Sequence, residues 1–416
     1  MTVLEILSLL FVTAALFGLL AARWLRLPIT IGTMLLAVLF SVALNLAAGR
    51  IPGAQHAAVE LLRQIDFGAV ILHGMLPLLL FAAAFLLDLN QLLREKLTVT
   101  LMATAGTVLS FFFVSGLMVL LSGGRIPWIQ GLVFGALVSP TDPIAVLEML
   151  GRSSVPARIQ AQLAGESLFN DGIGAVLFLT VLAVAAGQTP TVSAVAGTLA
   201  VEAGGAIVLG IVAAWFTSHM MRRVDNYQVD ILFSIALAFG GYVVATLLHL
   251  SAPLESVVAG IALRYFNHGV SPRRIAHEDI DGFWRVIDEI QNSILFVLMG
   301  FVTLSIALDA ATWRAGFSAI LSVNLVRFSC VAFLLAVVRL LQPSHQSSAL
   351  ILGWGGLRGG LSLALALTVP ESLGRSWILG ATYILVVFSV VVQGTSMSWL
   401  LHRIAGKAVA HPSPGA

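Results

Sequence analysis

The sequence contains almost no lysine and a single cysteine, and both scarcities restrict what the chain can be. Its only lysines are Lys96 and Lys407, and neither belongs to the Gly-rich pattern whose lysine reaches nucleotide phosphates. This excludes an ATP-driven pump built from this chain alone. The lone cysteine, Cys330, lies within an apolar segment, so no disulfide framework is possible.

Charged residues are also scarce, whereas apolar residues are abundant. Charged residues make up 10% of the 416 residues, apolar residues make up 59%, and the mean hydropathy is +0.99. This composition is typical of integral membrane proteins. A net charge of +2 is too small to indicate a nucleic-acid partner. The first apolar run, 3–22, has Glu5 rather than a basic cluster near its start, so we predict a transmembrane helix and no cleaved signal peptide.

Thirteen apolar segments are long enough, or nearly so, to cross a bilayer. A hydrocarbon core about 30 Å thick requires roughly 20 apolar residues per helix. The segments are 3–22, 28–48, 67–87, 97–121, 127–150, 159–186, 191–217, 228–248, 252–267, 289–309, 315–340, 347–369 and 376–402. The stretch 271–288 mixes acids with arginines, which predicts a surface amphipathic helix. The sequence therefore predicts an all-α polytopic membrane protein.

The distribution of basic residues supports this count. With the N-terminus outside, fifteen Lys and Arg residues lie on the cytoplasmic side and five on the other, while Arg327 and Arg358 lie within segments. An excess of basic residues marks the cytoplasmic side. We therefore expect the N-terminus outside and the C-terminus in the cytoplasm, in a bacterial inner (plasma) membrane.

Two segments contain residues that interrupt a helix. The fifth contains "SPTDPIAV" (139–146), in which two prolines bracket Thr141 and Asp142, and proline removes a backbone donor. The twelfth contains "GWGGLRGGLS" (353–362), with five glycines around Arg358. Irregular backbone at membrane depth persists only where protein packs around it or where it lines a wet cavity.

The positions of these interruptions predict two inverted six-helix halves in which broken helices 5 and 12 cross. The halves cover about 3–186 and 228–402, and the helix 191–217 links them. Interrupted segments at matching positions indicate a midplane binding site in a secondary transporter. We therefore predict one integral membrane transporter domain over 1–409 and a short disordered tail at 410–416.

The sixth segment carries four polar side chains in an otherwise apolar run. Glu166 and Asn170 are four residues apart and share one helix face. Ser167 and Asp171 form the adjacent stripe. Oxygen-rich side chains suit a hard cation such as Na⁺. A carboxylate can hold a proton instead, because burial disfavours its charged form. We predict that Na⁺ and H⁺ compete for Asp171.

Two further charges lie within the interruptions. Asp142 lies where unwound carbonyls and half-helix ends can help coordinate an ion. Arg358 requires an anion nearby, since a lone buried charge is strongly unfavourable. We predict an ion pair of Arg358 with Glu166, to which Asn170 is hydrogen-bonded.

Three other buried charges are harder to interpret. Glu202 and Glu255 lie near segment ends, where long side chains reach the interface, and we expect no direct role for either. Two roles are open for Arg327. It neutralises a helix terminus or carbonyl groups in the core, or it contributes to packing alone.

Four ordered stretches carry a family resemblance. They are "SPTDPIAV", "GESLFNDGIG", "WGGLRGGLSLALAL" and "VVFSVVVQGTS". Together they resemble the signature stretches of the NhaP/NHE-type sodium:proton antiporters of the monovalent cation:proton antiporter superfamily. The resemblance spans nearly the whole chain.

The resemblance implies a role for each polar residue of the site. Asp171 corresponds to the ion- and proton-binding aspartate, and Asp142 and Ser167 correspond to accessory ligands of the transported Na⁺. Thr141 contributes through its backbone. The structural triad beside the site corresponds to Glu166, Asn170 and Arg358. No resident cofactor is implied.

The resemblance also implies how exchange proceeds. Electrogenic relatives have a second aspartate where this chain has Asn170, so one Na⁺ (or Li⁺) is expected to exchange for one H⁺ without net charge. Family members are homodimers with an elevator-like movement and a role in pH homeostasis. About a dozen residues follow the last segment, so we expect no long regulatory tail.

Three alternatives stay open at this point. The side chains do not fix cation size, so K⁺/H⁺ exchange is the first alternative. A passive cation channel is the second. The third is an intramembrane aspartyl protease using Asp142 and Asp171, which the absence of a G-x-G-D stretch disfavours. We predict a transporter and no enzyme.

Overall fold

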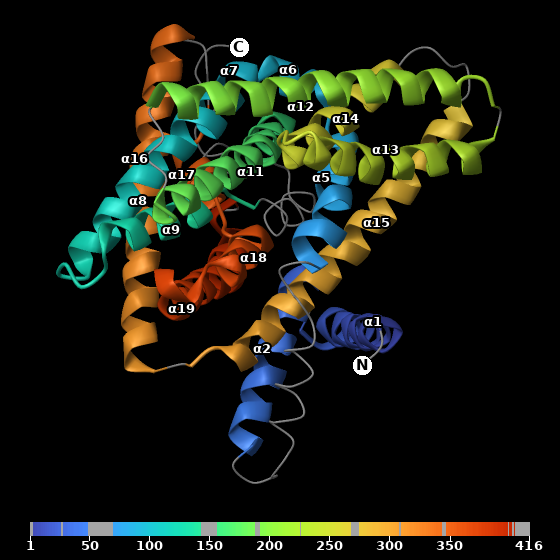
Figure 1. Ribbon diagram of the computed structural model, residues 1–416. Helices are drawn as coiled ribbons and strands as arrows, with labels where there is room; N and C mark the ends of the chain where they lie inside the picture. Colours follow the sequence, from blue (N-terminus) through green and yellow to red (C-terminus); the bar gives the residue numbers. More distant parts are fainter. Residues whose placement is uncertain are drawn as a thin grey trace, which may run out of the picture.

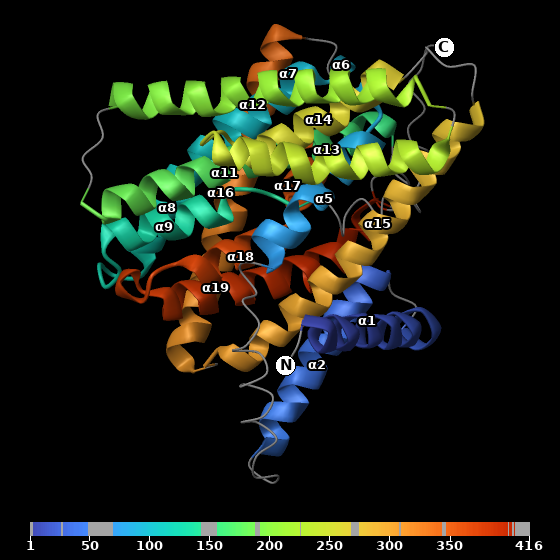
Figure 2. The same cartoon turned by 45° about the vertical axis from the view of Figure 1, so that its right-hand side comes forward.

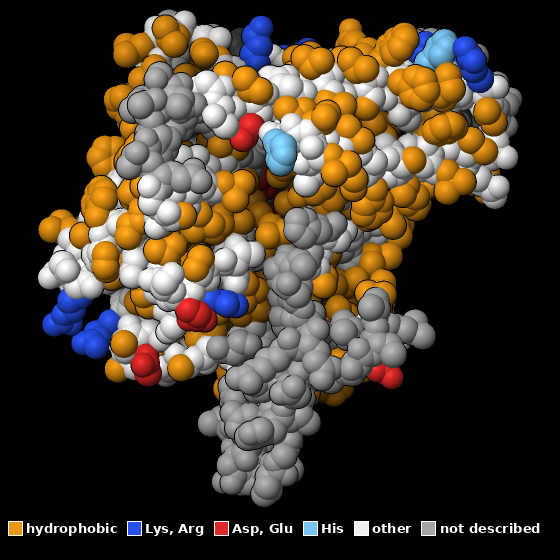
Figure 3. All heavy atoms as spheres, in the orientation of Figure 1, with side chains coloured by type: hydrophobic (Ala, Val, Ile, Leu, Met, Phe, Trp, Pro, Cys, Tyr) orange, Lys and Arg blue, Asp and Glu red, His pale blue; other side chains and the backbone are white. Residues whose placement is uncertain are grey.

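The computed structural model shows an all-helical chain with an apolar exterior. Among the described residues no strand occurs, and eight helices are long and apolar enough to cross a membrane. Hydrophobic side chains cover much of the face seen in Figure 3. The predicted all-α membrane fold is confirmed, whereas thirteen spans stay a prediction. The described residues are 3–25, 28–48, 70–142, 156–187, 192–224, 226–267, 274–307, 309–342, 347–397, 399–401 and 403.

The helices follow one another along the chain as labelled in Figure 1. Their bounds are α1 Val3–Leu20, α2 Ile29–Ala48, α5 Leu76–Leu86, α6 Leu89–Arg94, α7 Lys96–Leu101, α8 Thr107–Leu121, α9 Trp128–Val138, α11 Ala157–Ala185, α12 Val192–Met221, α13 Tyr227–Leu247, α14 Ala252–Asn267, α15 Arg274–Phe301, α16 Ala310–Leu341, α17 Ala349–Trp354, α18 Gly360–Thr368 and α19 Arg375–Val387. Short π-helical or 3₁₀ turns lie at Ala21–Leu25, Val70–Met75, Met102–Gly106, Val302–Ser305, Glu371–Leu373 and Phe388–Gly394.

Polar side chains mark where several helices begin. The Asn226 side chain accepts a hydrogen bond from the Gln228 amide at 2.8 Å and caps α13. Asp309 accepts one from the Thr312 amide at 2.7 Å and caps α16. This hydrogen bond lowers the pKa of the Asp309 carboxyl. Such caps satisfy amides that have no partner within the helix.

One predicted boundary is wrong. The sequence predicted a surface helix over 271–288 that is separate from the membrane segment 289–309, but α15 runs unbroken from Arg274 to Phe301. Figures 1 and 2 show it as a long helix that crosses the molecule obliquely. Charged residues change what surrounds a helix without ending it, and no proline interrupts this one.

Helices α8, α9, α11, α16 and α19 form a bundle, here called the site bundle, around the largest apolar cluster. Buried side chains such as Phe134, Val326 and Leu385 fill it. Gly135 of α9 lies against α8, since a Cβ there would lie 2.6 Å from the Phe111 carbonyl oxygen. Small residues let membrane helices approach closely. Helices α17 and α18, which flank the second interruption, pack into this cluster through Ile351, Leu352 and Leu363.

A second group packs α12, α13 and α14 against α5. Gly260 of α14 faces α5, because a Cβ there would lie 2.8 Å from the Phe81 carbonyl oxygen and 2.9 Å from the Ala84 Cβ. Both helices are buried at this contact, which has Phe81 and Ala84 at its centre. This second group and α15 lie beside the site bundle in Figures 1 and 2.

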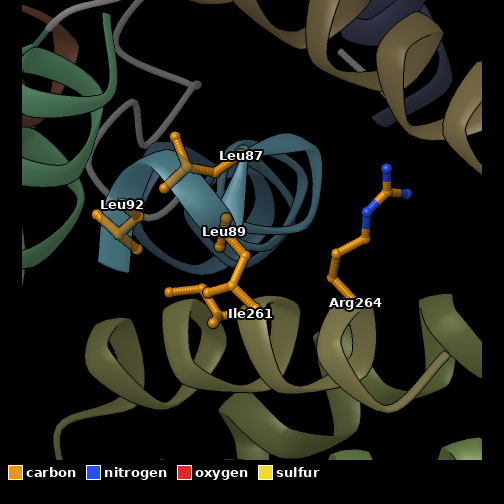
Figure 4. Close-up of a pocket in the computed structure, with 6 residues that line it drawn as sticks. Leu87, Leu89, Leu92, Ile261 and Arg264 are labelled. Carbon is orange, nitrogen blue, oxygen red and sulfur yellow. The ribbon is translucent and has the colours of Figure 1, made fainter. Parts of the chain in front are cut away.

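An ion pair ties α14 to α15 near one end of this group. Arg264 pairs with Asp281, and the Arg264 guanidinium carbon lies 5.4 Å from the centre of the Phe85 ring. Figure 4 shows Arg264 rising from α14 beside a small pocket. The other labelled lining residues are Leu87, Leu89, Leu92 and Ile261.

The contact of α14 with α5 makes a stability prediction. Gly260→Ala places a methyl group against backbone atoms that cannot move aside, and such overpacking costs about 1–3 kcal/mol. We expect a lower Tm and less monodisperse protein, measured by thermal unfolding and size-exclusion chromatography in detergent. Gly240→Ala is the control, because nothing lies within 4 Å of the added Cβ. Equal Tm values for both variants would contradict the packing argument.

Candidate functional site

The two interrupted segments meet in the middle of the site bundle. Helix α9 ends at Val138, and α17 and α18 leave residues 355–359 without regular helix. The Asp142 amide donates a hydrogen bond to the Leu357 carbonyl at 2.9 Å. A Cβ at Gly359 would collide with the Asp142 carboxylate. The two predicted interruptions are therefore in contact, although residues 143–150 of the predicted fifth segment lie outside the described residues, so the crossing of two broken helices stays a prediction.

Helix α11 holds the first break in place through Thr141. The Asn170 Oδ1 accepts from the Thr141 amide at 3.2 Å, and the Asn170 Nδ2 donates to the Thr141 hydroxyl at 2.8 Å. The Ser167 hydroxyl donates to the Thr141 carbonyl. All three side chains are buried. Unwound backbone in an apolar bundle needs such partners because no lipid group can supply them.

Helix α11 also comes unusually close to the break. A Cβ at Gly174 would collide with the Pro140 ring, so only glycine fits there without displacement. Gly174 lies one turn beyond Asn170 on the same helix face. Gly174 thus permits close packing of α11 against residues 140–142, and the Asn170 side chain holds this contact through its hydrogen bonds to Thr141.

Asp171 and Asp142 face a common cavity. Its volume is about 1050 Å³, and Ser167 also lines it. Both carboxylates are half-buried, and they lie close enough to interact electrostatically. A single water occupies about 30 Å³ of liquid, so this cavity has room for a hydrated ion. The structure therefore brings together Asp171, Asp142, Ser167 and Thr141 as predicted.

The Glu166 carboxylate has a different partner from the one predicted. Arg327 of α16 binds it through two guanidinium nitrogens, the Nη2–Oε2 distance being 2.8 Å. The Arg327 Nη2 also donates to the Leu352 carbonyl at 2.9 Å. The predicted pairing of Glu166 with Arg358 is therefore wrong. The predicted hydrogen bond from Asn170 to such a pair is also wrong, because Asn170 is bonded to Thr141.

The sequence contains two arginines within apolar segments, Arg327 and Arg358, and residue spacing does not show which of them pairs with Glu166. Arg327 lies in the middle of the 32-residue helix α16 without any motif around it. Gly356 lies against the Arg327 side chain, since a Cβ there would collide with the guanidinium group. The glycines around Arg358 thus make room for Arg327. This tertiary contact leaves no signal in the local sequence.

Arg358 is buried beside the pair. It is 1% exposed, and its Nη1 donates to the Gly356 carbonyl at 3.4 Å. Its Nε has no hydrogen-bond partner among the described residues. The Arg358 guanidinium lies within electrostatic range of Glu166, Arg327 and Cys330. Its positive charge is therefore offset only through space.

The remaining acids lie elsewhere. Glu255 is completely buried on α14, contrary to the expected position near the interface, and Glu202 lies on α12. No group of three or more His, Cys, Asp or Glu side chains able to hold a metal occurs among the described residues. On the opposite wall of the cavity, α15 contributes Asp288 and Asn292, which no motif in the sequence marks.

The Glu166–Arg327 pair makes a stability prediction. Arg327→Gln leaves a buried carboxylate without its partner, which costs about 3–5 kcal/mol. We expect a large loss of folded protein and a lower Tm, measured by size-exclusion chromatography and thermal unfolding in detergent. Arg358→Gln should destabilise less, because no carboxylate is paired with it among the described residues.

The matched control is Arg314→Gln, which removes an exposed arginine from the same helix. The double variant Glu166→Gln/Arg327→Gln should recover part of the lost stability. A Tm for Arg327→Gln equal to that of Arg314→Gln would contradict the importance of the pair.

Comparisons with known proteins identify the family of this chain. The family model described as "Sodium/hydrogen exchanger, transmembrane" matches residues 11–403. The Na⁺/H⁺ antiporter NhaP of Pseudomonas aeruginosa is 39% identical over 95% of both chains. The Na⁺/H⁺ antiporter NhaH of Halobacillus dabanensis is 32% identical over 96% of this chain and 97% of its own.

The fold is also found among solved structures. The sodium proton antiporter MjNhaP1 of Methanocaldococcus jannaschii superposes with a TM-score of 0.73, at 20% identity, over 97% of this chain and 98% of that chain. The chain is thus an integral membrane transporter and no enzyme. It belongs to the sodium/hydrogen exchanger family.

Proposed function

We propose that the protein exchanges Na⁺ or Li⁺ for H⁺ across the membrane, and that both ions compete for Asp171. The observation that carries this proposal is the position of Asp171, Asp142 and Ser167 on one cavity at the contact of the two helix breaks. The names of the relatives as Na⁺/H⁺ antiporters support it.

The donor set suits a hard monovalent cation. Two carboxylates, a hydroxyl and the Thr141 carbonyl supply only oxygen atoms, which such cations prefer. A cation that enters must exchange hydration water for these oxygens. A proton on Asp171 removes the negative charge that attracts the cation. The Asp171 carboxylate therefore binds either a cation or a proton, and never both at once.

A ratio of one cation to one proton follows from the proposed shared site. Asn170 contributes no charge beside Asp171, so Asp171 is the carboxylate that takes up one Na⁺ or one H⁺ in turn. Exchange of one monovalent cation for one proton moves no net charge, so the proposed exchange is electroneutral.

Alternating access completes the proposal. One wall of the cavity comes from α11 and the first break, and the facing wall comes from α1, α5 and α15. Movement of the site bundle against the facing wall opens Asp171 to one side of the membrane at a time. We place the N-terminus outside and the C-terminus in the cytoplasm of a bacterial inner membrane, in a homodimer. The halves 3–186 and 228–402, joined by 191–217, each contribute helices to the site bundle and to the facing wall.

The test is cation-driven proton movement in proteoliposomes. Addition of Na⁺ or Li⁺ should dissipate an imposed pH gradient at the same rate with and without a clamped membrane potential, whereas K⁺ should act weakly. Asp171→Asn should abolish the signal, because an amide carries no exchangeable charge. Asp279→Asn, an exposed acid on α15, is the matched control. Exchange retained in Asp171→Asn, or flux that follows voltage as in a channel, would refute the proposal.

Competition also predicts how pH acts. Below the pKa of the shared site, the apparent KM for Na⁺ should rise about tenfold for each pH unit of acidification, because one proton must leave before one cation binds. The maximal rate should stay constant where Na⁺ saturates. Measuring KM between pH 6 and pH 9, a range chosen around neutrality, checks this. A KM that is independent of pH would contradict a shared site.

A further inference from the structure

The helix opposite Asp171 presents a polar face to the cavity. Asp288, Asn292 and Leu295 of α15 are spaced four and three residues apart, which places them on one helix face, and all three line the cavity. Leu295 contacts the second break, since a Cβ at Gly360 would lie 2.6 Å from its Cδ1. With a rise of 1.5 Å per residue, Asn292 lies about 4.5 Å and Asp288 about 10 Å along α15 from that contact.

Asn292 carries an acceptor without a donor. Its side chain is 4% exposed, and it hydrogen-bonds to the Asp288 carboxylate. Because a carboxylate accepts, the amide nitrogen of Asn292 is the donor, which leaves the Oδ1 for another group. This Oδ1 has no hydrogen-bond partner among the described residues. Buried polar atoms usually have a partner, so the Oδ1 indicates a bound ligand with positive charge or a donor.

Asp288 adds negative charge at the same place. Its carboxylate is half-buried and forms no ion pair with a Lys or Arg that the structure describes. It lies within electrostatic range of Asp142 across the cavity. The facing wall therefore repeats, more loosely, the chemistry of the Asp171 site. A carboxylate and a carbonyl-type oxygen are the ligands that a hard cation takes.

We propose that the Asp288 carboxylate and the Asn292 Oδ1 form a second, outlying binding position for a hydrated monovalent cation. The ion binds there on its way from bulk water to Asp171. This inference rests on the proposed cation exchange. Two protein oxygens leave most of the hydration shell in place, so binding is weak enough for release toward Asp171, as conduction through successive sites requires.

The test compares two acids that lie side by side on α15. Asp288→Asn should raise the KM for Na⁺ about five- to tenfold, as expected for loss of one charge close to the ion, with an unchanged maximal rate. Asn292→Ala should raise it about two- to threefold, because a neutral ligand is lost. Glu289→Gln removes the same charge from an exposed neighbour that also lines the cavity. This control should change the KM by less than about twofold.

A binding measurement separates this inference from the proposed function. In purified Asp171→Asn protein, weak binding of ²²Na⁺ should persist and should be lost in Asp171→Asn/Asp288→Asn, but not in Asp171→Asn/Glu289→Gln. Equal KM shifts for Asp288→Asn and Glu289→Gln, or residual ²²Na⁺ binding that ignores Asp288, would overturn the second position. Failure of the proposed function would appear instead as no Na⁺-driven proton movement in the unaltered protein.

Discussion

Peptide groups freed by two helix breaks have to find partners inside an apolar bundle, and this constraint positions the whole site. The Asp142 amide is bonded to the Leu357 carbonyl, and Thr141 is held by Ser167 and Asn170. Since lipid and apolar side chains cannot replace these bonds, the breaks have one favourable register. The Asp142 carboxylate then points where Gly359 leaves room for it. The position of the ion site is therefore determined by the hydrogen bonds of the freed peptide groups as much as by charge.

Beside this contact of the breaks, a bidentate ion pair allows α11 and α16 to carry buried charge. Glu166 and Arg327 cancel each other, so neither competes strongly for an ion at Asp171. Arg358 adds a second positive charge within electrostatic range of Glu166. The balance between these groups decides how tightly a cation binds. A site with more negative charge would hold the ion too long for exchange.

Much of this arrangement could be predicted from the sequence, because the signals were local. Proline and glycine clusters marked both breaks, and the acids of α11 stood out in an apolar run. The sequence predicts the wrong partner for Glu166, since tertiary packing selects Arg327 instead of Arg358 and leaves no local signal. The continuity of α15 is not predicted, because the charged stretch 271–288 resembles a boundary although charge does not end a helix. Asn292 was missed because an unsatisfied oxygen is visible only once its neighbours are placed.

The unbroken length of α15 has a mechanical consequence. A helix of 28 residues is about 42 Å long, so α15 connects its polar N-terminal end to the wall of the ion cavity as one continuous helix. The Arg264–Asp281 ion pair joins α15 to α14 close to one end, and Leu295 contacts the second break further along the helix. Because the helix runs without a break between these two contacts, a displacement of α15 relative to α14 would also displace the Leu295 contact with the second break.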